Sequence, residues 1–135
     1  MRRVCGSMPI VRKLLTAIVG LFGVLFVFMG LQWLVDPLSA ATDLGLMLDA
    51  GVGLSSQVGD FSAFFLTVGL SILCALVSFN RVWYYPAIAL LVLAAIGRIV
   101  AWVVHDATLA LDLIAPEIFV AFLLVVASRI LPATD

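Results

Sequence analysis

The chain has 135 residues, of which 65% are hydrophobic and only 11% are charged, and its net charge is −1 at pH 7. Soluble domains are roughly 45–50% apolar and about 25% charged, so this composition excludes an ordinary water-soluble fold. The scattered, balanced charges also give no sign of a nucleic-acid-binding protein. We therefore predict a single-domain integral membrane protein, residues 1–135, whose main partner is the lipid bilayer.

Four apolar runs follow one another along the chain, at residues 14–35, 61–79, 86–104 and 113–131. At ~1.5 Å per helical residue, runs of this length cross the ~30 Å hydrocarbon core of a bilayer. None of them shows the alternating polarity of transmembrane β-strands. The sequence predicts an all-α membrane protein with four transmembrane helices in an up-down bundle.

The first run has a second interpretation. A basic segment, an apolar stretch and the sequence LSAAT at 38–42 are also typical of a cleavable signal peptide. However, the run holds 22 residues without a charge, more than the 7–15 residues of a signal-peptide core. We expect a retained helix.

The distribution of charge predicts the orientation. If the helices alternate in direction, one side of the membrane receives six basic residues, Arg2, Arg3, Arg12, Lys13, Arg81 and Arg129. The other side receives only acidic ones, namely Asp36, Asp43, Asp49, Asp60, Asp106 and Asp112. Basic residues collect in cytoplasmic loops, so both termini are expected in the cytoplasm.

Small residues recur along the runs and predict close helix packing, as in the series Thr67, Ser71, Cys74, Ala75 and Ser78. The same series also permits a polar path through the membrane. The short connection at 80–85 makes the second and third runs antiparallel neighbours, and the third and fourth runs follow the same rule.

Arg98 lies inside the third run, and a charged residue at such a position usually faces the bundle interior with a partner. Counting 1.5 Å per residue from the outer ends of the helices places Arg98 and Glu117 at similar depths. We therefore predict an ion pair between them. The planar arginine fork suits this pair because it holds a carboxylate through two parallel hydrogen bonds.

Four further residues are candidates for the same site. Trp102 and His105 share the Arg98 face of the helix, and Trp102 is placed to stack on the guanidinium. Asp60 and Asp36 lie at the outer ends of the second and first runs. Together with the pair they predict an outward-facing polar pocket, serving as a structural ion pair or as a ligand site.

Most of these residues also have an ordinary structural interpretation, and a single histidine such as His105 is more often an interfacial residue than a catalyst. Arg98 can extend its side chain outward to the headgroups. Glu117 follows Pro116, and a helix that starts at Ala115 would leave this carboxylate in its first turn. The two aspartates are common residues at helix ends.

Several short motifs resemble a family of small bacterial integral membrane proteins known only as a domain of unknown function, which is distantly similar to DoxX-type membrane proteins. The motifs are Asp36-Pro37, Asp60, Gly97-Arg98, His105-Asp106 and Pro116-Glu117. The resemblance implies four helices in the bacterial cytoplasmic membrane. It differs after Asp60, where Ser62 and Phe64–Phe65 replace an arginine and a glycine pair.

The sequence therefore favours a non-enzymatic structural, accessory or ligand-binding membrane protein with no cofactor. A proton or small-anion transporter that acts as a homo-oligomer is the alternative, since four helices without a repeat are few for alternating access. A membrane enzyme is disfavoured because metal-ligand and triad patterns are missing and the chain has a single histidine.

Overall fold

The computed structural model describes residues 4–132, and within them every regular element is a helix. The elements are α1 (Val4–Val35), α2 (Pro37–Asp43), α3 (Gly51–Ser78), the short 3-10 turn η1 (Arg81–Trp83), α4 (Tyr84–His105) and α5 (Leu111–Ile130). In this part of the chain, α1, α3, α4 and α5 are long and apolar enough to cross a membrane. This confirms the prediction of an all-helical chain with four such helices.

Two helices extend well beyond the predicted apolar runs. α1 begins at Val4 instead of residue 14, and α3 begins at Gly51 instead of residue 61. The start of α3 is held by Gln57, whose side-chain oxygen accepts from the Asp49 amide at 2.9 Å while its amide nitrogen donates to the Met47 carbonyl at 3.0 Å. Hydropathy falls before residue 61 and so limits the predicted apolar run, but the helix extends beyond this limit to Gly51.

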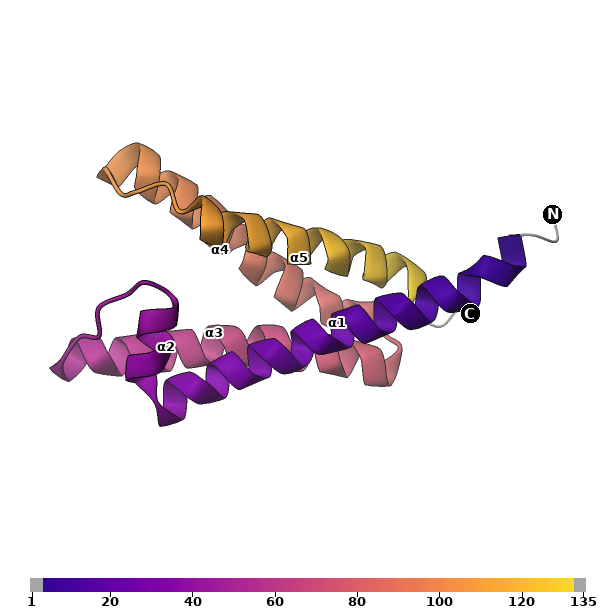
Figure 1. Cartoon of the computed structure of the whole chain (residues 1–135), viewed down its shortest axis with the longest axis horizontal. Coiled ribbons are helices and arrows are strands. Elements are labelled where there is room, and N and C mark those ends of the chain that lie inside the picture. Colours follow the sequence, from indigo (N-terminus) through magenta and orange to yellow (C-terminus); the bar gives the residue numbers. More distant parts are fainter. Residues whose placement is uncertain (1–3, 133–135) are drawn as a thin grey trace.

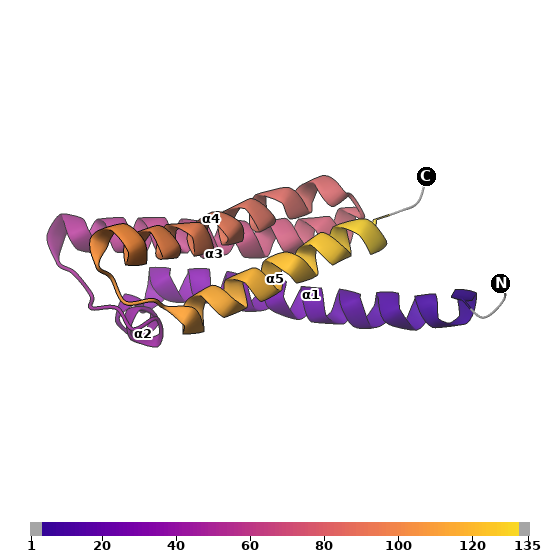
Figure 2. The ribbon, with the colours of Figure 1, turned by 90° about the horizontal axis from the view of Figure 1, so that it is seen from above.

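The long helices form two pairs, α1 with α3 and α4 with α5, and successive long helices run in opposite directions (Figure 1). The pairs meet at the end where α1 begins and α5 ends, through contacts of α5 with α1 and of α4 with α3. They separate toward the end that carries α2 (Figure 1), and in the view from above α4 overlies α3 while α5 crosses α1 (Figure 2). The molecule is therefore closed at one end and open at the other.

Glycines allow α1 and α3 to pack closely. A Cβ atom built on Gly69 of α3 would lie 2.6 Å from the Val27 amide nitrogen and 2.7 Å from the Gly23 carbonyl oxygen of α1. One built on Gly30 of α1 would lie 2.9 Å from the Leu66 amide nitrogen. Both positions exclude any side chain larger than hydrogen, because the backbone of the facing helix occupies the space. This is the small-residue packing that helices in lipid depend on.

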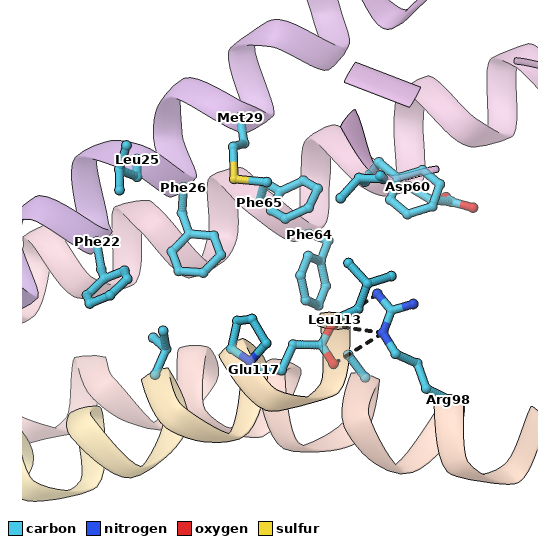
Figure 3. A pocket seen from close by; sticks show the side chains of 15 residues that line it. Phe22, Leu25, Phe26, Met29, Asp60, Phe64, Phe65, Arg98, Leu113 and Glu117 are labelled. Atoms are coloured by element: carbon cyan, nitrogen blue, oxygen red, sulfur yellow. Dashed lines mark hydrogen bonds and ion pairs between the residues drawn. The ribbon is translucent and has the colours of Figure 1, made fainter. Parts of the chain in front are cut away.

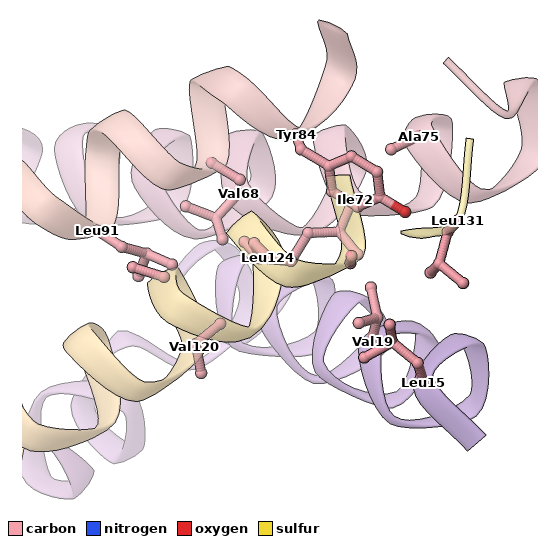
Figure 4. Close-up of a cluster of buried hydrophobic side chains, with 13 residues drawn as sticks. Leu15, Val19, Val68, Ile72, Ala75, Tyr84, Leu91, Val120, Leu124 and Leu131 are labelled. Atoms are coloured by element: carbon pink, nitrogen blue, oxygen red, sulfur yellow. The ribbon is translucent and has the colours of Figure 1, made fainter. Parts of the chain in front are cut away.

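The closed end holds the main apolar core, to which all four long helices contribute (Figure 4). Its largest fully buried members are Ile72 of α3, Tyr84 and Leu91 of α4, and Leu124 of α5. Val19 of α1 joins them at 0% exposure. This core fixes the two pairs at one end and leaves room between them at the other.

A smaller cluster fastens α2 to the α1–α3 pair at the open end. Ala40 and Ala41 of α2 are buried against Trp33 of α1 and Phe65 of α3. The Trp33 ring also stacks on Phe61 with centroids 4.7 Å apart. As a result α2 and the connection after it pack against one end of the α1–α3 pair.

Candidate functional site

A cavity of about 440 Å³ lies between the two helix pairs on the side where they separate (Figure 3). One wall comes from α1 and α3 and is largely aromatic, with Phe22, Phe26, Phe61, Phe64 and Phe65. The opposite wall comes from α4 and α5. Of the fifteen lining residues only three are charged, Asp60, Arg98 and Glu117. The cavity is therefore mostly apolar, in contrast to the polar pocket predicted from the sequence.

Arg98 of α4 and Glu117 of α5 form an ion pair at the wall of this cavity. The Arg98 Nε donates to both Glu117 carboxylate oxygens, at 3.1 and 3.2 Å, and Nη2 lies 3.1 Å from Oε1. The side chains are 33% and 12% exposed, respectively. A fork held in this way is stronger and more directional than a single charged contact. It joins α4 to α5 near the open end, where the main core does not reach.

Asp60 lines the same cavity from α3 but is not at the start of its helix. The prediction that Asp60 lies at the outer end of the second long helix is wrong, because α3 already begins at Gly51. Asp60 is exposed, and its carboxylate forms no ion pair or hydrogen bond with another residue of the described range 4–132. The cavity thus has one paired carboxylate and one available acceptor.

Trp102 and His105 do not join this site. Both are exposed on the surface of the chain, Trp102 at 48%, and neither lines the cavity. His105 is the last residue of α4. Helical spacing predicts both residues on the Arg98 face, but in the structure both are exposed and neither contributes to the cavity lining.

Asp36 also lies outside the cavity and acts as the N-cap of α2. Its Oδ2 accepts from the Ser39 hydroxyl at 2.7 Å, and its Oδ1 accepts from the Ser39 amide at 3.3 Å. Pro37 follows at the first helical position, where the missing N–H is not needed. The Asp36-Pro37 motif is therefore a helix start.

These bonds make the docking of α2 sensitive to pH. The hydrogen bond from the Ser39 hydroxyl, helped by the Ser39 amide, holds the pKa of Asp36 below its ordinary value of 3.8. A lowered pKa stabilises the folded form at higher pH, and this contribution disappears as the pH falls below 3.8 and the carboxylate is protonated. We expect Asp36→Ala to reduce the hydrogen-exchange protection of α2 at neutral pH, and the difference from wild type to shrink at acid pH. Equal protection at neutral pH would show that the cap does not hold α2.

The alternative that the last helix starts at Ala115 is wrong, because α5 begins at Leu111. Glu117 consequently lies in the second turn of the helix and Pro116 inside it. The carboxylate is beyond the first-turn positions where the helix dipole favours an acid most. The ion pair with Arg98, and not the helix dipole, accounts for an acidic residue at this position.

The aromatic wall is the part of the site that sequence reasoning missed. Phe22, Phe26 and Met29 lie at i, i+4 and i+7 on one face of α1, and all three line the cavity. Phe26 stacks on Phe65 of α3 with centroids 6.1 Å apart. Because most residues of the chain are apolar, only this spacing in the sequence could have indicated the aromatic wall.

Comparison with protein-family models, curated proteins and solved structures gives no significant match.

Proposed function

We propose that this chain is a small multi-pass membrane protein that binds an amphipathic ligand between its two helix pairs. The observation that carries the proposal is an apolar cavity of about 440 Å³ with an ion pair in its wall. Sites for small molecules are typically clefts of ~300–1,000 Å³, lined by apolar and aromatic side chains with a few polar groups that fix orientation. The cavity has both components.

The ligand class follows from the lining. The phenylalanine side chains offer an apolar surface to a hydrocarbon or ring system. Arg98 and Glu117 already neutralise each other, and Asp60 adds an acceptor. A molecule with an apolar body and a small hydrogen-bonding group that carries no net negative charge fits these surroundings best.

The orientation belongs to the same proposal. Arg12, Lys13, Arg81 and Arg129 gather at the end of the molecule where the helix pairs converge. Arg2 and Arg3 lie outside the described residues. By the positive-inside tendency this end is cytoplasmic, which puts both termini in the cytoplasm and the cavity toward the outer leaflet of a bacterial cytoplasmic membrane. The resemblance inferred from the short sequence motifs implies the same arrangement.

Filling the cavity should remove the ligand. Ala94 lines the cavity from α4, whereas Ala89 of the same helix is exposed on the outer surface. We expect Ala94→Trp to eliminate a small-molecule mass that co-purifies with the wild-type protein in native mass spectrometry, because the indole occupies its place. Ala89→Trp is the matched control and should keep that mass.

The proposal would be contradicted if the wild-type protein, extracted mildly and directly from membranes, carried no bound small molecule. Equal retention by the two tryptophan variants would also contradict it. Transport of a proton or small anion is tested in parallel in proteoliposomes. A flux that is lost in Arg98→Ala but kept in Ala94→Trp would favour transport over ligand binding.

A further inference from the structure

A second, smaller cavity lies at the closed end of the molecule, on the opposite side of the core from the site described above. It measures about 90 Å³ and is enclosed by all four long helices or their ends. α1 contributes Arg12 and Thr16, α4 contributes Tyr84, and Leu131 follows α5. The apolar part of the lining comes from Ala75 and Leu76 of α3 and from Phe79, which follows that helix.

The Tyr84 hydroxyl has no hydrogen-bond partner among the described residues 4–132. Tyr84 is only 1% exposed, and its ring is fixed within the main core beside Ala75 and Leu131 (Figure 4). Buried hydroxyl groups almost always have a partner. Since Tyr84 also lines the cavity, a guest there is the natural partner for this group.

Arg12 supplies charge to the same cavity. Its Nη2 donates to the Leu131 carbonyl oxygen at 3.2 Å, which orients the guanidinium between α1 and the end of α5. A guanidinium has five N–H donors in a planar fork, and this bond uses one of them. The polar side chains of the lining are thus a cation and two hydroxyls, Thr16 and Tyr84, with no acid among them.

One positive charge with two hydroxyls that can donate, and no acid, favours a guest that accepts hydrogen bonds and carries negative charge. The volume of about 90 Å³ corresponds to roughly three water molecules at ~30 Å³ each, which is the scale of one phosphate group. Lys13, Arg81 and Arg129 are exposed at the same end of the molecule and raise the local positive potential. Basic pockets between transmembrane helices are a recurrent form of anionic headgroup site.

We propose that this cavity binds a phosphate group, held by Arg12 and the Tyr84 hydroxyl, and that an anionic phospholipid of the adjacent leaflet supplies it. The headgroup then ties the start of α1 to the ends of α3 and α5. The site is separate from the ligand cavity at the open end, so either proposal can fail without the other.

The test compares Arg12→Gln and Tyr84→Phe with Lys13→Gln. Lys13→Gln removes the same charge from the neighbouring residue, which does not line the cavity. Tyr84→Phe removes only the hydroxyl and keeps the ring in the core. In native mass spectrometry from mixed phosphatidylglycerol and phosphatidylcholine micelles, we expect phosphatidylglycerol retention to fall about tenfold in Arg12→Gln and about threefold in Tyr84→Phe. Lys13→Gln should stay close to wild type.

Two further arms identify the source of the phosphate. Thermal protection by phosphatidylglycerol in phosphate-free buffer indicates the lipid headgroup. If inorganic phosphate alone protects the protein in phosphatidylcholine micelles, and this protection depends on Arg12, the ligand is a free anion. This result would overturn the lipid as the source of the phosphate. Equal losses in Arg12→Gln and Lys13→Gln, or retention unchanged in Tyr84→Phe, would overturn the site, since binding would then depend on diffuse surface charge.

Discussion

Replacing Gly69 with alanine is expected to destabilise the protein by about 2–3 kcal/mol, in the range typical of overpacking a tight contact. The new methyl group would meet the Val27 amide nitrogen at 2.6 Å and the Gly23 carbonyl oxygen at 2.7 Å. These are backbone atoms of α1 and cannot move aside as a flexible side chain does. We therefore expect the α1–α3 pair to separate at this point, and Gly69→Leu to leave no folded fraction. The measurement is reversible unfolding in mixed micelles by SDS titration, followed by tryptophan fluorescence.

Gly97→Ala is the matched control for this experiment. Gly97 is also inside a transmembrane helix, but a Cβ atom there meets nothing within 4 Å. Alanine is about 1 kcal/mol better than glycine in a helix interior, so this variant should be as stable as wild type or more stable. If Gly69→Ala matched Gly97→Ala in stability, the close approach of α1 and α3 would be wrong.

Much of this fold can be read from hydropathy, because lipid demands long, apolar, fully hydrogen-bonded segments. Four apolar runs in the sequence become α1, α3, α4 and α5 in the structure. The start of α3 was not predictable in this way. Its first turns interrupt their apolar residues with glycine, serine and Gln57, and Ala50 provides no capping side chain. These turns are held by the Gln57 bonds to Asp49 and Met47, which depend on the fold of the preceding connection.

The part of the site that depends on how far along its helix each residue lies could be predicted from the sequence. The part that depends on which face of a helix turns inward could not. Arg98 and Glu117 were predicted at similar depths on consecutive helices, and in the structure their side chains are in contact. Trp102 and His105 were predicted from helical spacing alone, yet both are exposed and neither lines the cavity. Which face of α4 looks inward is set by its packing on α5 and α3, and a periodicity argument on a helix that is apolar all round cannot supply it.

The ion pair should produce the second large effect. Glu117→Leu leaves Arg98 without a partner within the membrane, and Arg98→Leu leaves the carboxylate alone. We expect each single variant to lose about 2–3 kcal/mol of stability, at the low end for breaking a buried pair because Arg98 remains 33% exposed. The double variant Arg98→Leu/Glu117→Leu should recover to within about 1 kcal/mol of wild type, since no unpaired charge then remains in lipid. The same SDS titration measures all three.

Arg129→Leu controls for the loss of a positive charge, because Arg129 is exposed in the last turn of α5 and should change stability by no more than about 0.5 kcal/mol. Arg98→Lys keeps the charge but loses the planar fork, and its stability should fall between those of wild type and Arg98→Leu.

A double variant as unstable as the singles would mean that the pair does not act as one unit. A double variant that regains stability but no longer retains the co-purifying molecule would separate the two roles of the pair. It would show that apolar contacts can replace the fastening of α4 to α5, whereas ligand binding requires the charges themselves.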